Sequence, residues 1–295
     1  MKERRERSGQ HGLPGFKLRA MIDLLDRPHH ERPLGGGCIA QVSLLEFEDG
    51  EKLVAKRDGG RGGDLELEGW MLRYLAQNST LPVPEVHHCE SELLLMSWLP
   101  DGGGLSTAAE RHAADLIAKL HAITAPDFGL ERDSLIGPLH QPNPQETDWI
   151  TFFRDHRLLY MADLAKDRGR LPAGTRHQID RLAVRLPDLI PAGVKPSLLH
   201  GDLWGGNILA SGDRISGFID PAIYYGDREM DLAFSTLFGS LGEGFFQRYQ
   251  ELQPLEPGFF EERRELYNLY PLLVHTALFG GGYAGAVKRI TEGFL

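Results

Sequence analysis

The chain has 295 residues, of which 41% are apolar and 25% charged, values typical of a globular protein long enough for one large domain or two lobes. Its formal net charge of −10 argues against a nucleic-acid partner, because contact with a phosphate backbone requires a basic face. Only two cysteines occur, which suits a reducing compartment. No apolar run approaches the ~20 residues of a membrane helix, and the opening MKERRERSGQHG does not have the pattern of a secretory signal. We therefore expect a cytoplasmic protein without a membrane partner.

The first predicted elements are a helix and a hairpin. A short amphipathic helix is predicted at residues 16–26, and Pro28 and Pro33 end it. The next segment, GGGCIAQVSLLEFEDGEKLVAKRDG, predicts two strands joined at Asp49-Gly50, a dipeptide that is typical of tight hairpin turns. The three glycines therefore open a hairpin.

These glycines match the kinase nucleotide loop G-x-G-x-x-G-x-V, with alanine in the last glycine position. The letters also fit a dinucleotide fingerprint, but that motif requires a strand before it and a helix after it, whereas here a strand follows. A glycine-rich turn without a ligand is a further alternative. The loop residues expected to contact ATP are Gly35, Gly36, Gly37, Cys38, Ala40 and Val42. Whether Cys38 is also a redox-sensitive thiol is left open.

Lys56 ends the run Val54-Ala55-Lys56 on the second strand of the hairpin, where a kinase places its phosphate-binding lysine. The helical segment LELEGWMLRYLA follows, and a glutamate in its first turns can hold the lysine ammonium toward the α- and β-phosphates. We expect Glu68 to take this role, with Glu66 as the alternative.

Two more strands, predicted in LPVPEVHH and ELLLMSWLP, complete an antiparallel sheet of about five. The second runs into the breaker-rich PDGGG, where we place the boundary between a nucleotide-binding lobe of residues 1–99 and a catalytic and substrate-binding lobe of residues 100–295. In a kinase this hinge, at about residues 96–101, presents backbone groups to adenine. The hinge residues expected to contact ATP are Met96, Ser97, Trp98 and Leu99.

The second lobe is predicted to be mainly helical. Thr107 and Glu110 predict a capping box before AERHAADLIAKLHAI, in which His121 is expected to be buried. Residues 129–145 predict a long loop. TDWITFFRDHRLLYMADLAKDRG predicts a long helix that packs its aromatic side chains in the core, and TRHQIDRLAVRLPDLI predicts another.

The candidate catalytic residues lie in the segment LLHGDLWGGNILASGDRISGFID. His200, Asp202 and Asn207 have the H-x-D-x-x-x-x-N spacing of a phosphotransfer loop, in which the aspartate accepts the proton of the acceptor hydroxyl and orients it. Asn207, and Asp220 at the end of a second predicted hairpin, offer the hard oxygens that Mg²⁺ prefers. Asp231 is expected to support the loop by accepting backbone N–H groups, and His200 is expected to have a similar structural role.

Three segments resemble the fructosamine (ketosamine) kinase family, a branch of the aminoglycoside phosphotransferase and choline kinase superfamily: HGDLWGGN, FIDPAIYYGDREMDLA and ELYNLYPLLVHTALFGGGY. HGD with the downstream ID marks the superfamily, whereas Trp204, DPAIYYG and FGGGY narrow the resemblance to this branch. It covers nearly the whole chain and implies a two-lobed, protein-kinase-like α+β fold, with a five-stranded antiparallel sheet and a helix in the first lobe.

The resemblance also implies ATP and Mg²⁺ as cofactors and transfer to a sugar hydroxyl of a ketosamine, either free or on a glycated protein lysine, in protein deglycation repair. By position it makes Asp202 the base, Asn207 and Asp220 the metal ligands, and Trp204 a neighbour of the acceptor. Asp227 stands where the family leads us to expect histidine, which leaves the substrate contacts open.

Other functions are left open beside this one. One is a phosphotransferase of the same fold that acts on an aminoglycoside, choline or another small alcohol. Another is an inactive nucleotide-binding pseudokinase, against which the intact set of Lys56, Asp202, Asn207 and Asp220 argues. Neither the physiological acceptor, nor the hydroxyl phosphorylated, nor the oligomeric state can be read from the sequence.

Overall fold

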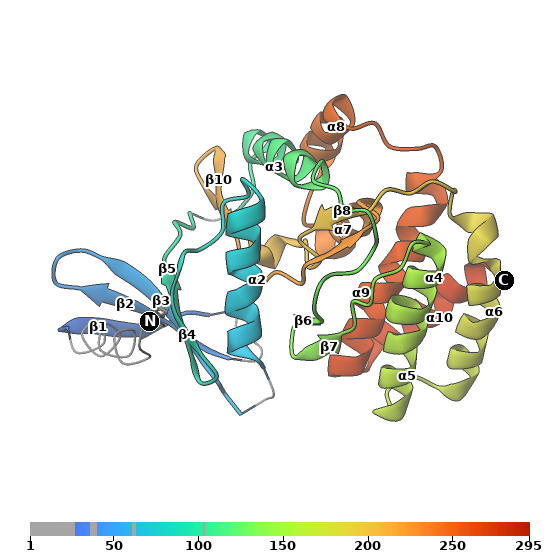
Figure 1. Cartoon of the computed structure of the whole chain (residues 1–295), viewed down its shortest axis with the longest axis horizontal. Coiled ribbons are helices and arrows are strands. Elements are labelled where there is room, and N and C mark those ends of the chain that lie inside the picture. The colour runs from blue at the N-terminus through green and yellow to red at the C-terminus, as the bar shows by residue number, and fades with distance from the viewer. Residues whose placement is uncertain (1–26, 36–39, 61–62, 103) are drawn as a thin grey trace, which may run out of the picture.

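The computed structural model describes residues 27–35, 40–60, 63–102 and 104–295 and has two lobes, a sheet with one helix and a larger, mainly helical part (Figure 1). The strands are β1 (His29–Pro33), β2 (Gln41–Phe47), β3 (Lys52–Arg57), β4 (Val86–Glu90), β5 (Leu93–Ser97), β6 (Ser134–Ile136), β7 (Leu139–Gln141), β8 (Ser197–Leu199), β9 (Ile208–Ser211), β10 (Arg214–Phe218) and β11 (Tyr224–Gly226). The α-helices are α2 (Leu65–Asn78), α3 (Thr107–His121), α4 (Trp149–Phe153), α5 (Tyr160–Asp167), α6 (Ala173–Leu189), α7 (Glu229–Phe234), α8 (Glu243–Leu252), α9 (Arg264–Phe279) and α10 (Gly282–Gly293). The π-helical and 3-10 turns are η1 (Arg154–Leu159), η2 (Gly205–Asn207), η3 (Leu237–Gly239) and η4 (Phe259–Arg263).

The first lobe is a five-stranded antiparallel sheet in the order β1-β2-β3-β5-β4, which confirms the predicted sheet. Its hairpin turns at Gly50, whose φ of +87° suits the predicted Asp-Gly turn. The sequence prediction missed β1, because it assigned Pro28 and Pro33 to a break. Pro33 is tolerated there because β1 is an edge strand, where a missing N–H need not interrupt the ladder.

The alternation of side chains along β3 decides which residues meet α2. Val54 belongs to the apolar cluster that includes Leu65 and Leu72 of α2, whereas Leu53 and Ala55 face the other side of the sheet. Lys56 has the same parity as Val54, so it points to the α2 side. The helix itself begins after Asp64, whose carboxylate accepts the N–H of Leu67.

The second lobe packs its helices around one large core. Figure 1 shows α3 beside α8, and α4, α5, α6, α9 and α10 together at the end of the molecule away from the sheet. The aromatic side chains predicted to be in the core, Trp149, Phe152 and Phe153, are buried. The long helix that carries them contains a π-helical turn, η1, between α4 and α5.

Two local predictions in this lobe are wrong. The cap of α3 is Ser106, whose Oγ accepts the N–H of Ala109, and not Thr107. Glu110 accepts the N–H of Gly242 instead of closing a capping box. Residues 129–145 are not a loop throughout, because they form the β6–β7 hairpin with a register of Ser134 opposite Gln141.

The helix predicted at residues 16–26 lies outside the described residues. Within the described ranges, no helix is both long and apolar enough to cross a membrane.

Candidate active site

A cleft of about 830 Å³ lies between the sheet and the helical lobe. Most of the predicted site residues line it. They are Gly35, Ala40, Val42, Lys56, Glu68, Met96, Ser97, Trp98, Leu99, Asp202, Trp204, Asn207 and Asp220. Gly36, Gly37 and Cys38, also predicted to contact ATP, lie outside the described residues. The structure thus brings three distant segments, the hairpin, the hinge and the catalytic loop, to one cavity.

Lys56 joins the two lobes through ion pairs. Its Nζ donates to Glu68 Oε1 at 2.6 Å and contacts Asp220 Oδ1. Glu66, the alternative partner, is exposed on the other side of α2. Burial lowers the pKa of Lys56, but the charges of Asp220 and Glu68 outweigh it and raise this pKa above its ordinary value. The lysine is therefore a permanent cation in the cleft.

Asp231 holds the backbone of the catalytic loop. Its carboxylate accepts the N–H groups of His200 and Gly201, both at 2.8 Å, and contacts Nε2 of the buried His121 at 3.2 Å. Gly201 has a φ of +83°, and a Cβ there would lie 1.9 Å from the carbonyl oxygen of Ala222. The loop can therefore take this path only with glycine at position 201.

His200 is buried, and its Nδ1 accepts the N–H of Asp202 at 3.3 Å. Burial lowers the pKa of His200, so its ring is neutral at neutral pH. It thus lies behind the loop as a packing and hydrogen-bonding group.

Asp202 is half-buried at the floor of the cleft. Asn207 Nδ2 donates to its side-chain Oδ2 at 2.8 Å and to its backbone oxygen at 2.9 Å. Burial raises the pKa of the Asp202 carboxyl to about 7, the charges of Asp220 and Asp231 add to this, and hydrogen bonds from Asn207 and Trp204 oppose it. A carboxyl group that titrates near neutrality is suited to accept a proton.

Asn207 and Asp220 provide a donor set that fits Mg²⁺. Both side-chain hydrogen bonds of Asn207 use Nδ2, which leaves Oδ1 for a cation. The N–H of Ile219 donates to the backbone oxygen of Asn207 at 3.0 Å and so holds Asp220 beside it. In the described part of the chain there is no group of three or more His, Cys, Asp and Glu side chains placed to hold a metal. A cation bound here would share its ligands with phosphate and water, as Mg²⁺ commonly does.

Another part of the cleft is an aromatic wall, which the sequence prediction found only in part. The wall consists of Trp204, Phe238, His275, Phe279 and Tyr283, all of which line the cavity. Their rings follow one another, with centroid separations of 5.9 Å from Trp204 to Phe238, 5.2 Å from Phe238 to His275 and 5.0 Å from His275 to Tyr283. The FGGGY string of the sequence contains Phe279 and Tyr283, whereas no sequence motif singled out Phe238.

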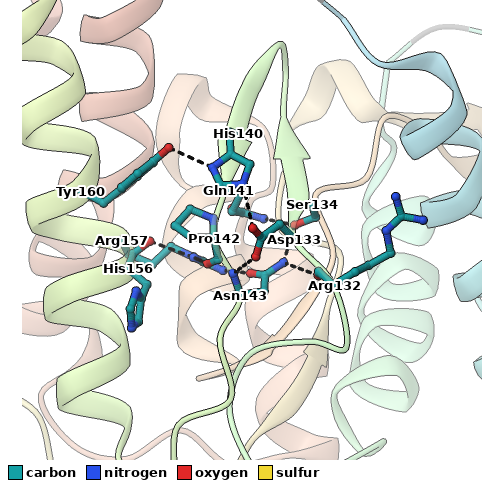
Figure 2. A network of polar contacts seen from close by, with 10 residues as sticks. All are labelled: Arg132, Asp133, Ser134, His140, Gln141, Pro142, Asn143, His156, Arg157 and Tyr160. Atoms are coloured by element: carbon teal, nitrogen blue, oxygen red, sulfur yellow. Dashed lines mark hydrogen bonds and ion pairs between the residues drawn. The ribbon is translucent and has the colours of Figure 1, made fainter. Parts of the chain in front are cut away.

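The β6–β7 hairpin closes another side of the cleft through Leu135, Ile136 and Gly137. Figure 2 shows the polar network at its base, in which the buried Arg157 donates to Asn143 Oδ1 at 2.6 Å. Asn143 in turn donates to Ser134 Oγ at 2.7 Å. The sequence prediction missed this wall because the two strands have only three residues each, and the turn and flanking segments around them are rich in glycine, proline and asparagine, the composition of a loop.

Comparisons with known proteins agree on one family. A family model described as fructosamine kinase matches residues 20–295. A Synechocystis sp. protein named probable ketoamine kinase is 36% identical over 272 residues, 90% of this chain and 90% of that protein. A chloroplastic protein-ribulosamine 3-kinase of Arabidopsis thaliana is 32% identical over 272 residues, 89% of this chain and 81% of that protein.

Solved structures extend this likeness to the fold. The structure of a protein assigned as a fructosamine-3-kinase from Thermobifida fusca has a TM-score of 0.82 at 29% identity and covers 96% of this chain and 99% of that chain. An ADP-bound aminoglycoside phosphotransferase has a TM-score of 0.63 at 16% identity, covering 96% of this chain and 100% of that chain, a likeness of fold alone. The two-lobed kinase-like architecture predicted from the sequence is thereby confirmed.

Proposed function

The chain belongs to the fructosamine kinase family, whose members are phosphotransferases, and from this premise we propose that it phosphorylates ketosamines with ATP. The acceptor is a sugar hydroxyl of a fructosamine or ribulosamine adduct, free or on a glycated protein lysine. We assign ATP binding to residues 1–99 and catalysis and acceptor binding to residues 100–295. Where the phosphorylated adduct is unstable, the reaction would remove the sugar and repair the amine.

The observation that carries this proposal is the position of Asp202 in the shared cleft, with its carboxylate oriented by Asn207. In the proposed step the acceptor hydroxyl forms a bond to the γ-phosphorus of ATP while the bond to the β-phosphate oxygen breaks. Asp202 accepts the hydroxyl proton, and ADP leaves. Holding the reacting groups in line supplies much of the rate enhancement in this chemistry.

The nucleotide is proposed to lie against the sheet, with its adenine at Met96 to Leu99. Leu99 is held against Gly217 of β10, where an added Cβ would lie 2.3 Å from its Cδ1. Lys56, oriented by Glu68, would bind the α- and β-phosphates. Asn207 and Asp220 would hold Mg²⁺, which when bound neutralises charge on the transferred phosphoryl group.

The rival function is a phosphotransferase of the same fold that acts on an aminoglycoside or choline. The test is a panel in which the purified protein, Mg²⁺ and ATP are incubated with a fructosamine, a ribulosamine, a glycated lysine peptide, an aminoglycoside and choline. Mass spectrometry of each acceptor should show one added phosphate on the ketosamines, which removal of divalent cations by EDTA abolishes and added Mg²⁺ restores. Transfer to the aminoglycoside or choline, with none to a ketosamine, would refute the proposal.

A further inference from the structure

Phe238 has a backbone conformation that its side chain disfavours. It lies in η3 with a φ of +62° and a ψ of 14°, the left-handed region that bulky residues rarely adopt. Its ring is nevertheless 51% exposed, so burial in the core does not compensate for this conformation. Strained residues of this kind cluster at active sites, ligand-binding segments and switch regions. The exposed face of Phe238 belongs to the cleft.

The rings of the aromatic wall follow one another in a row that begins next to Asp202, the proposed base. Trp204 comes first, because it lies two residues after Asp202 and its indole lies over Gly206, where an added Cβ would be 2.3 Å from the ring. Phe238 and His275 come next, and Phe279, 55% exposed, lies beyond them at 5.8 Å from His275 between ring centroids. A group that extends from Asp202 along this wall therefore meets Trp204 first and Phe238 and His275 second.

His275 adds a polar atom to this wall. Its Nδ1 lies 2.8 Å from the carbonyl oxygen of Pro271, which can only accept, so Nδ1 carries the proton. Burial lowers the pKa of His275, and the neutral ring then has a lone pair on Nε2. A neutral imidazole can accept a hydrogen bond from an N–H group and does not repel a cation.

These features fit one part of a ketosamine, namely the secondary amine next to the sugar and the carbon chain attached to it. This amine is largely protonated at neutral pH, and aromatic ring faces attract ammonium groups. The amine is carried on the carbon beside the ketose carbonyl carbon, so it lies within one sugar's length of the reacting hydroxyl. Building on the proposed function, we propose that Phe238 and His275 form a subsite for the protonated amine, while Phe279 and Tyr283 receive its carbon chain.

The test compares three probes that share the ketose. They are Nα-acetyl-Nε-fructosyl-lysine, the same compound with its secondary amine acetylated, and fructose. KM and kcat are measured for the first probe, and inhibition constants against its phosphorylation are measured for the other two, so that neither needs to be turned over. The proteins compared are the wild type, Phe238→Ala, Phe238→Tyr and, as a matched control at an exposed apolar residue outside the cleft, Leu252→Ala.

For the wild type, the KM of the amine probe should lie about tenfold below both inhibition constants. Phe238→Ala should raise this KM about tenfold, with kcat within about twofold and the inhibition constant of fructose unchanged. Phe238→Tyr should restore the KM, and Leu252→Ala should leave it unaltered. Phe279→Ala, at a second exposed ring, should raise the KM about threefold.

Equal changes for the amine probe and fructose, or no change in Phe238→Ala and Phe279→Ala, would overturn the subsite. A wild-type protein that phosphorylates no ketosamine would instead overturn the proposed function. The two failures are therefore distinguishable.

Discussion

The two walls of the cleft are built in opposite ways. On one wall, the charged wall that carries Asp202 and Lys56, hydrogen bonds fix the groups in place: Asp231 holds the backbone of the loop before Asp202, and Glu68 holds Lys56. On the aromatic wall, the ring of Trp204 is followed by rings from η3, α9 and α10, and two of these residues, Phe238 and Phe279, are more than half exposed.

This difference separates two tasks of a phosphotransferase. Transfer of a phosphoryl group requires fixed charges at fixed positions, because the stabilisation of charge depends on groups that are already oriented. Selection of an acceptor requires a surface that matches one class of molecule, and rings provide contact area without strict direction. Substitutions on the charged wall should therefore change kcat or the KM for ATP, and substitutions on the aromatic wall should change the KM for the acceptor.

The largest effect is expected at Asp202. Asp202→Ala removes the proton acceptor of the hydroxyl and should lower kcat about 10²- to 10⁴-fold, while the affinity for ATP changes little. Steady-state kinetics with a ketosamine and calorimetric titration with ATP would measure the two quantities. Unchanged turnover would refute the assignment of the base.

A smaller effect is expected at Glu68. Glu68→Gln leaves Lys56 with Asp220 as its remaining carboxylate partner, and loss of a charged hydrogen bond should raise the KM for ATP about tenfold or more. Glu66→Gln is the matched control on the same helix and should have no effect, since Glu66 is exposed. A reversal of the two results would transfer the role to Glu66.

The pH dependence should follow Asp202. Only the ionised carboxylate accepts a proton, and its pKa is raised to about 7. Activity is therefore lost as pH falls through this value, and kcat/KM for ATP, which reports the enzyme before nucleotide and cation bind, should decrease about tenfold between about pH 8 and about pH 6. A bound cation lowers carboxyl pKa values nearby, so the kcat profile should turn down at lower pH. A kcat/KM profile that is flat over this range would contradict the prediction.

The smallest effect is expected from the backbone strain at Phe238 in the aromatic wall. Phe238→Gly and Phe238→Ala both remove the ring, but only glycine is free of the penalty at φ +62°. Phe238→Gly should therefore exceed Phe238→Ala in free energy of unfolding by about 1 kcal/mol, measured by chemical denaturation. Equal stabilities would mean that the backbone relaxes in the alanine variant.

The contrast between the charged wall and the aromatic wall also explains which site residues could be predicted from the sequence. Lys56, Asp202, Asn207 and Asp220 were predicted as a set because their spacing is fixed by a hairpin and a short loop, and the structure brings all of them to the cleft. Their chemical roles stay predictions until activity is measured. The hairpin and the strands β4 and β5 were also predictable, because local alternation and a turn dipeptide mark them.

The remaining features depend on contacts between distant segments. In the sequence, Phe238 and His275 cannot be told from ordinary core residues. They form part of the aromatic wall only because η3 packs against α9. Strand β1 depends on its pairing with β2, which proline obscured. The N-cap of α3 is Ser106, and Glu110 accepts a hydrogen bond from Gly242, 132 residues further on, a partner that rules for local helix capping do not predict.

The backbone conformation at Gly201 limits which residues related proteins can have at this position. Its left-handed backbone and the carbonyl oxygen of Ala222, 1.9 Å from any added Cβ, constrain this position independently of the reaction. A relative without a carboxylate at the position of Asp202 would still need glycine before it for the loop to follow the same path. The histidine and glycine of an H-G-D string therefore report the shape of the loop, whereas the aspartate is the residue of the string that we propose to take part in the reaction.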